Sequence, residues 1–234
     1  MRKLTVVIPV YNEQETIHEV VERVCAVDLG SIEKEIVISD DGSTDSTPAA
    51  IENSRNAHAE IVRVYTSPTN LGKGAAVRLG MSLAKGDVII IQDADLELDP
   101  AEYSRILDPF LTHSADVVYG SRFARHTSRI SARTRWANRF LTTLTNLLFS
   151  GHLTDMETAY KAFRREVIQK IRLRCVRFDF EPEITAKLLR AGYAIHEVPI
   201  SYNPRSAAAG KKISWVDGIE AIYTLLRCRF VDSQ

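Results

Sequence analysis

Two aspartates one residue apart, Asp93 and Asp95, are the side chains best placed to do chemistry in this sequence. They follow the apolar run 88–91, which is typical of a strand buried on both faces. In open α/β sheets the ligand crevice lies outside the carboxyl ends of the strands. Two carboxylates at that edge suit Mg²⁺ or Mn²⁺, which proteins hold through carboxylates together with substrate phosphates. The alternative is a solvated acidic turn, which an isolated pair of this kind would favour.

A second acidic pair, Asp40 and Asp41, follows the strand-like run 35–39. Carboxylates at the end of a strand can accept hydrogen bonds from a nucleobase N–H or from ribose hydroxyls. The glycine that comes next permits the tight turn that exposes them. Asp45 or Ser46 would also cap the helix that follows. We therefore expect Asp40 and Asp41 to bind a ligand and Asp45 or Ser46 to cap.

Two common phosphate-binding loops are absent from the sequence. The turn at 9–13, after the first strand-like run, has no glycine, so the dinucleotide fingerprint is missing. Gly72-Lys73 and Gly210-Lys211 each lack the earlier glycine that a P-loop requires. A divalent ion at Asp93 and Asp95 is the remaining obvious way to neutralise a diphosphate.

The elements that must position these residues alternate between strand and helix up to about residue 120. This alternation predicts a doubly wound, mostly parallel α/β sheet with helices on both faces. Strands are expected at 4–8, 35–39, 61–65, 87–92 and 116–119, and helices at 15–27, 47–56, 74–84 and 101–111. Helices at 136–149, 182–191 and 215–230 and a strand at 194–202 predict a C-terminal helical elaboration. We expect one domain over 1–234, in which 1–120 binds a nucleotide and 121–234 handles an acceptor.

Composition and charge are those of an ordinary globular protein. Of the 234 residues, 45% are hydrophobic and 26% are charged, and the net charge is zero. Any attraction to nucleic acid or to an anionic membrane must therefore be local. The three widely spaced cysteines suggest neither a metal framework nor a disulfide framework. The sequence offers no signal peptide and no bilayer-spanning run, so we expect a cytoplasmic protein.

Four motifs in order resemble the inverting glycosyltransferases of family 2, which have the GT-A fold. They are VIPVYNE at 7–13, DDGSTD at 40–45, NLGKG at 70–74 and DAD at 93–95. Within that family, GSR at 120–122, TDMET at 154–158, FEPE at 180–183 and GKKI at 210–213 resemble the polyprenyl- or dolichyl-phosphate sugar synthases. The resemblance implies metal-dependent, inverting transfer of a hexose from UDP-glucose or GDP-mannose to a polyprenyl or dolichyl phosphate.

The resemblance also implies roles for the matched residues. The residues of the nucleotide pocket would be Pro9, Tyr11, Glu13 and Lys73, with Asp40 or Asp41 on the base or ribose. Asp93 and Asp95 would hold Mg²⁺ or Mn²⁺, with Glu97 as a third ligand. One departure lies at 154–161, where dolichyl-phosphate mannose synthases usually carry serine-glycine-phenylalanine. This departure puts mannose in doubt and tilts the donor towards UDP-glucose.

A phosphate acceptor would give the arginines of 122–139 a role, since this segment holds six arginines and no acidic residue. The planar guanidinium matches phosphate oxygens bidentately, in a contact worth roughly 1.5–3 kcal/mol. Arg122, expected at a strand end beside the metal strand, is the first choice, followed by Arg133 and Arg135 from the next loop. The remaining residues expected around the acceptor or its phosphate are Asp155, Arg205, Lys211 and Lys212, the last three on a basic flap. Arg125 and Arg129 are expected to be solvated.

A phosphate acceptor also removes the need for a catalytic base. A phosphate monoester has a second pKa near about 6 and is mostly dianionic at pH 7, whereas a sugar hydroxyl must lose a proton. We expect in-line attack with inversion, with Asp95, Arg122 and Arg133 as catalytic residues. Glu157, Glu181 and Glu183 are left open as sugar contacts.

Two amphipathic stretches, 136–149 and 215–230, suggest peripheral contact with the membrane that carries such a lipid. The alternative is that both apolar stripes pack on the core. Two other functions stay open as well. One is a glycosyltransferase with a soluble or glycan hydroxyl acceptor, and the other is a nucleotide-sugar-binding module without turnover. No nucleic-acid partner is expected, and the sequence leaves the oligomeric state open.

Overall fold

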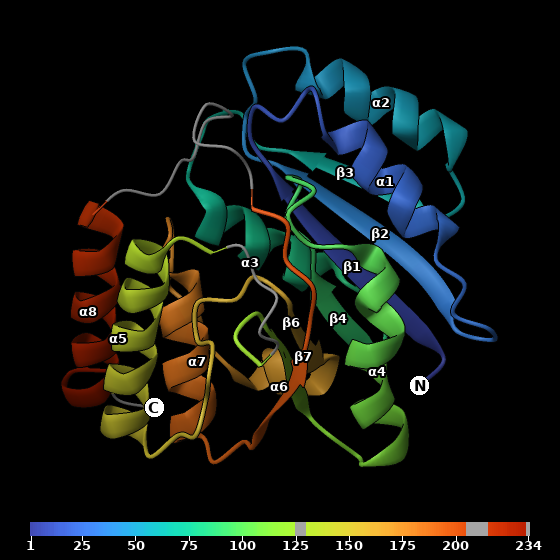
Figure 1. Ribbon diagram of the computed structural model, residues 1–234. Helices are drawn as coiled ribbons and strands as arrows, with labels where there is room; N and C mark the ends of the chain where they lie inside the picture. Colours follow the sequence, from blue (N-terminus) through green and yellow to red (C-terminus); the bar gives the residue numbers. More distant parts are fainter. Residues whose placement is uncertain (125–129, 205–214, 233–234) are drawn as a thin grey trace.

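A seven-stranded sheet forms the centre of the computed structural model, which describes residues 1–124, 130–204 and 215–232 (Figure 1). The strands are β1 (Lys3–Val10), β2 (Glu33–Asp40), β3 (Val62–Thr66), β4 (Val88–Ile91), β5 (Val117–Ser121), β6 (Lys161–Arg164) and β7 (Ile195–Pro199). The helices are α1 (Ile17–Ala26), α2 (Thr47–Ala57), α3 (Lys73–Leu83), α4 (Tyr103–Thr112), α5 (Ala132–Phe149), α6 (Arg165–Lys170), α7 (Phe180–Arg190) and α8 (Trp215–Phe230).

The strand order is β3-β2-β1-β4-β6-β5-β7. The pairs β1–β2, β1–β4, β2–β3 and β5–β7 are parallel, whereas β6 runs antiparallel to both of its neighbours. The predicted mostly parallel, doubly wound sheet is therefore confirmed. The single reversed strand lies between β4 and β5.

Both faces of the sheet are covered by helices because its central strands are apolar on both sides. In β1, Val6 and Ile8 pack with the helices α1, α2 and α4 on one face, while Val7 packs with α3, α6 and α7 on the other. All three side chains are fully buried. Burial of a side chain of this size contributes roughly 1.5–3 kcal/mol. The strands that carry the site are therefore held rigidly from both sides.

The C-terminal helices form the predicted elaboration. α5, α7 and α8 lie side by side at the left of Figure 1 and share a third apolar cluster, which includes Leu141, Phe149 and Leu225. The alternative that both apolar stripes pack on the core is wrong for most of the α8 stripe and only partly right for α5, whose Leu141 and Phe149 are buried. Trp136 and Trp215 are each 72% exposed, because α8 buries its other side, through Ala221, Leu225 and Cys228.

Three local features differ from the sequence predictions. α5 begins at Ala132 rather than 136, because Ser131 Oγ accepts a hydrogen bond from the Thr134 backbone N–H and caps an earlier start. β7 ends at Pro199, short of the expected 202. β6 and α6 were not expected at all. β6 has four residues and begins with a lysine, Lys161, so it carries no apolar run that would indicate a strand.

Candidate functional site

The carboxyl ends of the parallel strands bring the predicted residues to one edge of the sheet. β1 and β4 run side by side in parallel, with Val7 opposite Ile91. β5 has the same direction as β4, because both are antiparallel to β6. Arg122 therefore follows β5 at the edge where Asp93 follows β4. The expectation that Arg122 lies directly beside the metal strand is wrong, because β6 separates the two strands.

The loops after β1 and β2 are hydrogen-bonded to each other. The backbone N–H of Asn12 donates to Ser43 Oγ at 3.0 Å, and that of Glu13 donates to Thr47 Oγ1 at 2.8 Å. These bonds fix the backbone that carries the expected nucleotide-pocket residues. Those residues are Pro9, Tyr11 and Glu13.

The two aspartates after β2 have different partners. Both carboxylate oxygens of Asp41 accept backbone N–H groups, from Leu71 at 2.8 Å and Gly72 at 2.7 Å, so this residue holds the turn before α3. Asp40 Oδ1 accepts from Ser43, whereas its Oδ2 is buried with no hydrogen-bond partner among the described residues. Both aspartates line a groove of about 830 Å³ beside α3. Asp40 is therefore the stronger candidate for a base or ribose contact.

The predicted helix cap after this pair is only partly correct. Asp45 Oδ1 accepts a hydrogen bond from the Thr47 backbone N–H at 2.9 Å, as expected of a cap residue. Ser46 occupies the N-cap position of α2, but its side chain makes no capping hydrogen bond.

Asp93 and Asp95 lie in the turn that follows β4. Asp95 Oδ1 accepts the backbone N–H of Glu97 at 3.1 Å, and Asp93 faces the ammonium group of Lys73. The side chains fit a divalent cation, because they are hard oxygen donors at the crevice edge and one already attracts a cation. Glu97, the expected third ligand, has its Oε2 engaged by the hydroxyl of Tyr202 at 2.7 Å.

A buried amide that sequence reasoning missed shapes this turn. Gln92 Nε2 donates to the carbonyl oxygens of Asp93 at 3.1 Å and Leu98 at 3.3 Å. Its Oε1 accepts from the hydroxyls of Tyr103 and Tyr160 at 2.9 and 2.6 Å. The sequence does hold a signal for Gln92, which is an amide at the end of an otherwise apolar strand. A buried polar side chain at such a position must find hydrogen-bond partners.

Lys73, expected to contact the nucleotide, bridges two carboxylates. Its Nζ lies 3.0 Å from both oxygens of Asp93 and 3.0 Å from Glu181 Oε1. Burial acts to lower the pKa of the Lys73 ammonium, but Asp93 and then Glu181 outweigh burial and raise it. Glu181, left open as a sugar contact, is thus an ion-pair partner at the end of the site where the nucleotide sugar is expected, which we name the donor end.

The other end of the site, where the acceptor is expected and which we name the acceptor end, contains a buried ion pair. Arg122 donates to Asp155 through Nε at 2.7 Å, through Nη2 at 2.8 Å and through its backbone N–H at 3.0 Å. The Asp155 side chain is fully buried and that of Arg122 is 12% exposed. Burial acts to lower the pKa of the Arg122 guanidinium, but Asp155 outweighs burial and raises it. Asp155 therefore positions Arg122, which stays charged.

Two residues from the β7 region support this pair and were not predicted. Glu197 accepts the backbone N–H groups of Thr154 at 2.7 Å and Asp155 at 3.0 Å. The ring of Tyr202 lies 5.3 Å from the Arg122 guanidinium carbon, within cation–π range. Because the same tyrosine donates to Glu97, it links the acceptor end to the turn that carries Asp95. Neither residue belongs to a recognisable motif, so the sequence held no signal for them.

Between the two ends lie the half-buried Glu157 and the fully buried Lys161. Lys161 Nζ donates to the Met156 carbonyl at 2.6 Å and lies 3.8 Å from the centre of the Tyr119 ring. Burial lowers the pKa of Lys161. Burial, and then the neighbouring Glu181, raise the pKa of Glu157 to about 7. Glu157 Oε1 is buried with no hydrogen-bond partner among the described residues.

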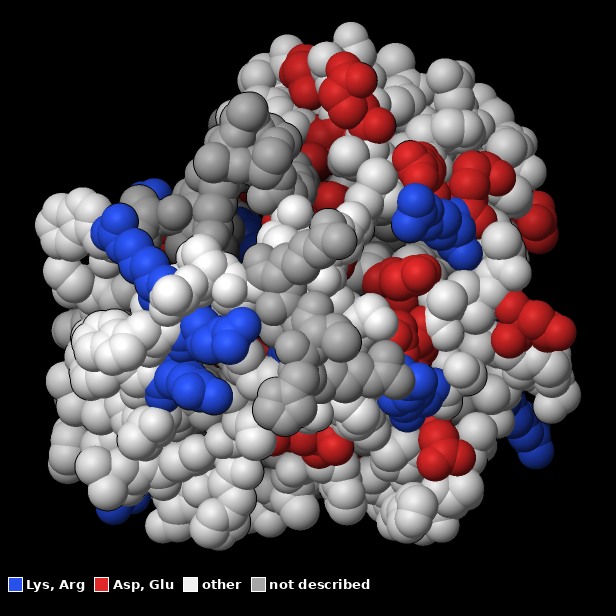
Figure 2. Space-filling model, viewed as in Figure 1, with Lys and Arg blue, Asp and Glu red and all other residues white. Residues whose placement is uncertain are grey.

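The other basic residues predicted to bind the acceptor phosphate lie on α5 or outside the described residues. Arg133 and Arg135 lie in the first turn of α5 rather than in a loop, and Arg133 is exposed. Figure 2 shows a group of Lys and Arg side chains at the left of the view, where α5 lies, while Asp and Glu predominate in the upper and right parts. Arg125, Arg129, Arg205, Lys211 and Lys212 lie outside the described residues.

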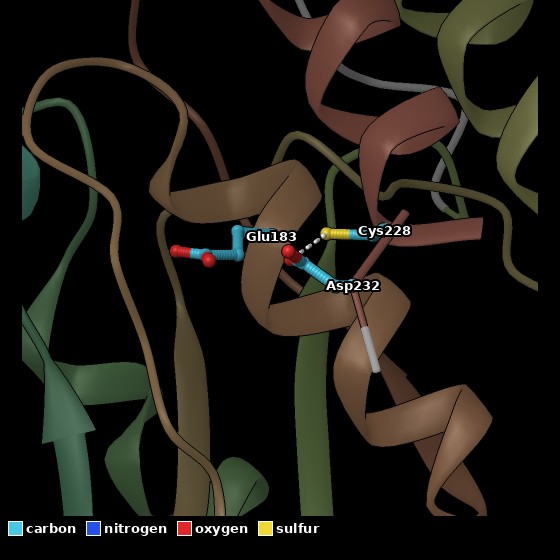
Figure 3. A group of neighbouring side chains, drawn as sticks. All are labelled: Glu183, Cys228 and Asp232. Carbon is cyan, nitrogen blue, oxygen red and sulfur yellow. Dashed lines mark hydrogen bonds between the residues drawn. The ribbon is translucent and has the colours of Figure 1, made fainter. Parts of the chain in front are cut away.

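Glu183, also left open as a sugar contact, belongs to a different cluster. It lies with Cys228 and Asp232 where α7 meets the end of α8 (Figure 3). Glu183 Oε1 already accepts from Lys187 at 2.7 Å and Arg227 at 3.3 Å. Burial, and then Glu183, raise the pKa of the Cys228 thiol to about 11. Because the Cys228 thiol keeps its proton and cations already pair with Glu183, this cluster is an ion-pair network that joins two helices. It does not suit a metal.

Comparison with known sequences identifies a family and its members. The profile described as Glycosyl transferase family 2 matches residues 5–172. Polyprenol monophosphomannose synthase from Mycolicibacterium smegmatis is 31% identical over 222 residues, covering 90% of this chain and 81% of that protein. Undecaprenyl-phosphate 4-deoxy-4-formamido-L-arabinose transferase from Pseudomonas fluorescens is 30% identical over 227 residues and 96% of this chain. This chain spans 64% of the length of the P. fluorescens transferase.

Solved structures share the fold. Glucosyl-3-phosphoglycerate synthase from Mycobacterium tuberculosis in complex with UDP superposes with a TM-score of 0.77 at 22% identity, covering 99% of this chain and 82% of that chain. The complex of this synthase with Mn²⁺, UDP and phosphoglyceric acid gives a TM-score of 0.74 at 21% identity, with coverage of 100% and 80%. At this identity the likeness concerns the fold.

Proposed function

The chain belongs to glycosyl transferase family 2 and has the GT-A fold, and from this premise we propose that it transfers a sugar from a nucleotide diphosphate sugar to a polyprenyl phosphate. The observation that carries the proposal is the presence, on one sheet edge, of a carboxylate end suited to a metal-bound diphosphate and a guanidinium end suited to a phosphate. Asp93 and Asp95 form the donor end, and Arg122, held by Asp155, forms the acceptor end. Two relatives named for polyprenyl phosphate acceptors, of which this chain covers 81% and 64%, support the choice of acceptor.

The donor end offers contacts for the base or ribose and for the diphosphate of a nucleotide diphosphate sugar. Asp40 has a carboxylate oxygen for the base or ribose, and the family resemblance adds Pro9, Tyr11 and Glu13 from the end of β1 and the loop after it. Lys73 offers an ammonium for the diphosphate. Asp93 and Asp95 would hold Mg²⁺ or Mn²⁺, which neutralises charge on the leaving diphosphate when bound. The synthase from M. tuberculosis, whose complexes contain UDP and either Mn²⁺ or Mg²⁺, supports a divalent ion.

The acceptor end suits a phosphate that attacks without a base. Arg122 is fixed by Asp155, Tyr202 and the Glu197-held backbone, so its guanidinium is oriented before the acceptor arrives. Such preorganisation lowers the entropic cost of aligning two anions. A phosphate dianion is nucleophilic at neutral pH, and we therefore assign in-line displacement with inversion and no essential base. Arg133 and Arg135 are the next candidates for phosphate contact, from the start of α5.

The sugar and the base are the least constrained parts of the proposal. The first expectation was a hexose from UDP-glucose or GDP-mannose. One relative is named for mannose and another for 4-deoxy-4-formamido-L-arabinose, which is a pentose. The segment 154–161, whose departure tilts the donor towards UDP-glucose, supplies Asp155 at the acceptor end and Glu157 between the two ends. A thermal-shift screen of UDP and GDP with and without Mn²⁺ would identify the base, because a bound ligand raises apparent stability.

We also assign a peripheral membrane contact to the exposed aromatic face of α5 and α8. The residues of this aromatic face are Trp136, Phe140, Leu147, Trp215, Ile219, Tyr223 and Phe230. Trp136 and Phe140 stack at 5.8 Å, and Arg133 and Arg139 are exposed on the same helix. Exposed aromatic side chains beside arginines match the boundary of an anionic bilayer. Among the helices that the structure describes, none has the length and apolar character to cross a bilayer.

The membrane contact is tested by sedimentation with anionic liposomes. We expect Trp136→Ala to reduce the bound fraction, because an exposed indole contributes interfacial burial. Leu111→Ala removes an exposed apolar side chain from α4, away from the aromatic face, and serves as the control. Full recovery of the unmodified protein in the supernatant would contradict the assignment.

The reaction is tested with radiolabelled nucleotide sugar and polyprenyl phosphate. The expected product is extractable into organic solvent and labile to mild acid, since the sugar is attached through a phosphate. Label that enters only water-soluble glycan would favour a hydroxyl acceptor. Binding of the nucleotide sugar without release of nucleotide would favour a binding module.

A further inference from the structure

The Lys73 ammonium occupies the position at Asp93 that a divalent cation would take. The Nζ atom contacts both oxygens of Asp93 at 3.0 Å, and these oxygens are ones that a divalent cation would need. An ammonium and a metal cannot both occupy that position, because like charges repel strongly at short range. Lys73 must therefore move when a divalent ion binds Asp93.

The backbone around Lys73 restricts that movement to the side chain. Gly72 and Gly74 pack so closely on the segment 176–177 that a Cβ would lie 2.4 Å from the Val176 carbonyl and 2.9 Å from the Arg177 carbonyl. The backbone N–H of Gly74 also donates to the Arg177 carbonyl at 2.8 Å. The Cα of Lys73 is thus fixed at the junction of α3 and the approach to α7. Only the flexible four-carbon side chain can relocate its charge.

Glu181 lies where it can retain the displaced ammonium. Its Oε1 already accepts from Lys73 at 3.0 Å, and its side chain is 8% exposed, so the contact is well shielded from water. Glu181 stands in the first turn of α7, whose start is fixed through Asp179, which accepts the backbone N–H groups of Val176 and Arg177. An ammonium that leaves Asp93 therefore keeps one fixed anionic partner.

We propose that Lys73 and a divalent cation compete for Asp93, and that Glu181 is the positioning residue that keeps the displaced ammonium at the donor end. The proposal rests on the proposed function. It predicts that metal binds weakly until a nucleotide diphosphate supplies the lysine with a new partner. Metal and nucleotide then bind with positive coupling, because each favours the same position of one side chain.

The test measures Mn²⁺ binding to the full chain by calorimetry or electron paramagnetic resonance, without turnover. Lys73→Met should tighten Mn²⁺ binding in the absence of nucleotide by about five- to tenfold, a typical coupling between neighbouring sites. The same variant should weaken UDP or GDP binding in the presence of Mn²⁺. Lys73→Arg keeps the charge and should bind Mn²⁺ no more tightly than the unmodified protein.

A matched control and a double-variant cycle complete the experiment. Arg78→Met removes a cation from the same helix that contacts the Cys175 carbonyl, and should leave Mn²⁺ affinity unchanged. Glu181→Gln should weaken Mn²⁺ binding several-fold, and this effect should disappear in the Lys73→Met background if Glu181 acts through the lysine. Thermal unfolding of each variant checks that it is folded.

The outcomes separate the inference from the proposed function. Unchanged or weaker Mn²⁺ binding by Lys73→Met would overturn the competition. An equal effect of Glu181→Gln in both backgrounds would overturn the positioning role. If the unmodified protein binds neither Mn²⁺ nor Mg²⁺ with any nucleotide diphosphate, the proposed metal dependence fails and the inference fails with it.

Discussion

The two ends of the site are held in different ways. At the donor end, backbone groups fix the loops: Asp41 binds two backbone N–H groups, and the loops after β1 and β2 bind each other. Ion pairs between residues distant in sequence occur at both ends, but Arg122–Asp155 at the acceptor end, with side chains 12% and 0% exposed, is more buried than Lys73–Glu181 at the donor end, with 19% and 8%. The backbone N–H donors at the donor end carry no charge that burial must compensate, whereas the buried charges at the acceptor end depend on one another and on protonation. The difference predicts that the acceptor end is the more fragile of the two.

Asp155→Ala tests the acceptor end and should have the largest effect on stability. Removal of one partner leaves the largely buried Arg122 guanidinium uncompensated, which typically costs about 3–5 kcal/mol of unfolding free energy. Urea unfolding measures the loss. Glu19→Ala removes the partner of Arg23 in an exposed ion pair and should cost less than about 1 kcal/mol. Similar losses in the two variants would show that the acceptor end is not specially dependent on charge.

Asp95→Ala tests the donor end through activity rather than stability. Loss of a predicted metal ligand should lower kcat by about 100- to 1,000-fold, the range found when one electrostatic stabiliser of a transition state is removed. Asp99→Ala is the control, because Asp99 lies in the same loop and only caps the turn at Ala101. Unchanged sugar transfer by Asp95→Ala would remove the metal assignment.

Gly72→Ala tests the junction at which the donor end meets the approach to α7. Gly72 has a φ of +110°, and an added Cβ would lie 2.4 Å from the Val176 carbonyl. We expect Gly72→Ala to lower the free energy of unfolding by about 2–4 kcal/mol, because alanine is strained at this positive φ and its Cβ would be too close to the Val176 carbonyl. Gly192→Ala shares the positive φ but has open space, so only the strain of about 1–2 kcal/mol should appear. Equal losses in differential scanning calorimetry would mean that the junction is loose.

Glu157→Gln tests how the stability of the protein depends on pH through the charges between the two ends. Because the folded protein raises the pKa of Glu157 from 4.5 to about 7, the native state holds the proton more tightly than the unfolded chain. Stability from this group is therefore complete below pH 4.5 and is lost as the pH rises to about 7, by roughly 1 kcal/mol per pH unit. Urea unfolding between pH 5 and pH 7 should show this decline in the unmodified protein and in the exposed-site control Glu60→Gln. An equal decline in Glu157→Gln would contradict the assignment.

The placement of the donor-end residues was largely predictable from the sequence. Asp40 ends β2 and Asp41 follows it, while Asp93 and Asp95 lie in the turn after β4. Such a strand end fixes which edge of the sheet a residue occupies. The acceptor end was predictable only in part. Arg122 follows a strand in the same way, but its partner Asp155 and the supporting Glu197 come from segments that β6 and β7 bring in from afar.

The failures have physical causes that can be traced to single residues. Lys161 opens a four-residue strand although it is charged, because burial against Tyr119 and the Met156 carbonyl overrides strand propensity. The aromatic stripe of α8 resembled a core face, yet Ala221 and Cys228 form the buried side. Small residues pack closely between helices but add little to an apolar pattern, so the pattern indicated the wrong face.

The reversed strand β6 also determines when the sheet can be completed during synthesis of the chain. β4 is entirely apolar, and its second neighbour is residues 161–164, which leave the ribosome long after residue 91. Until then β4 is an open sheet edge, the kind of surface on which chains aggregate. Pairings this distant in sequence also slow folding. We therefore expect the nascent N-terminal half to be prone to aggregation until β6 pairs with β4.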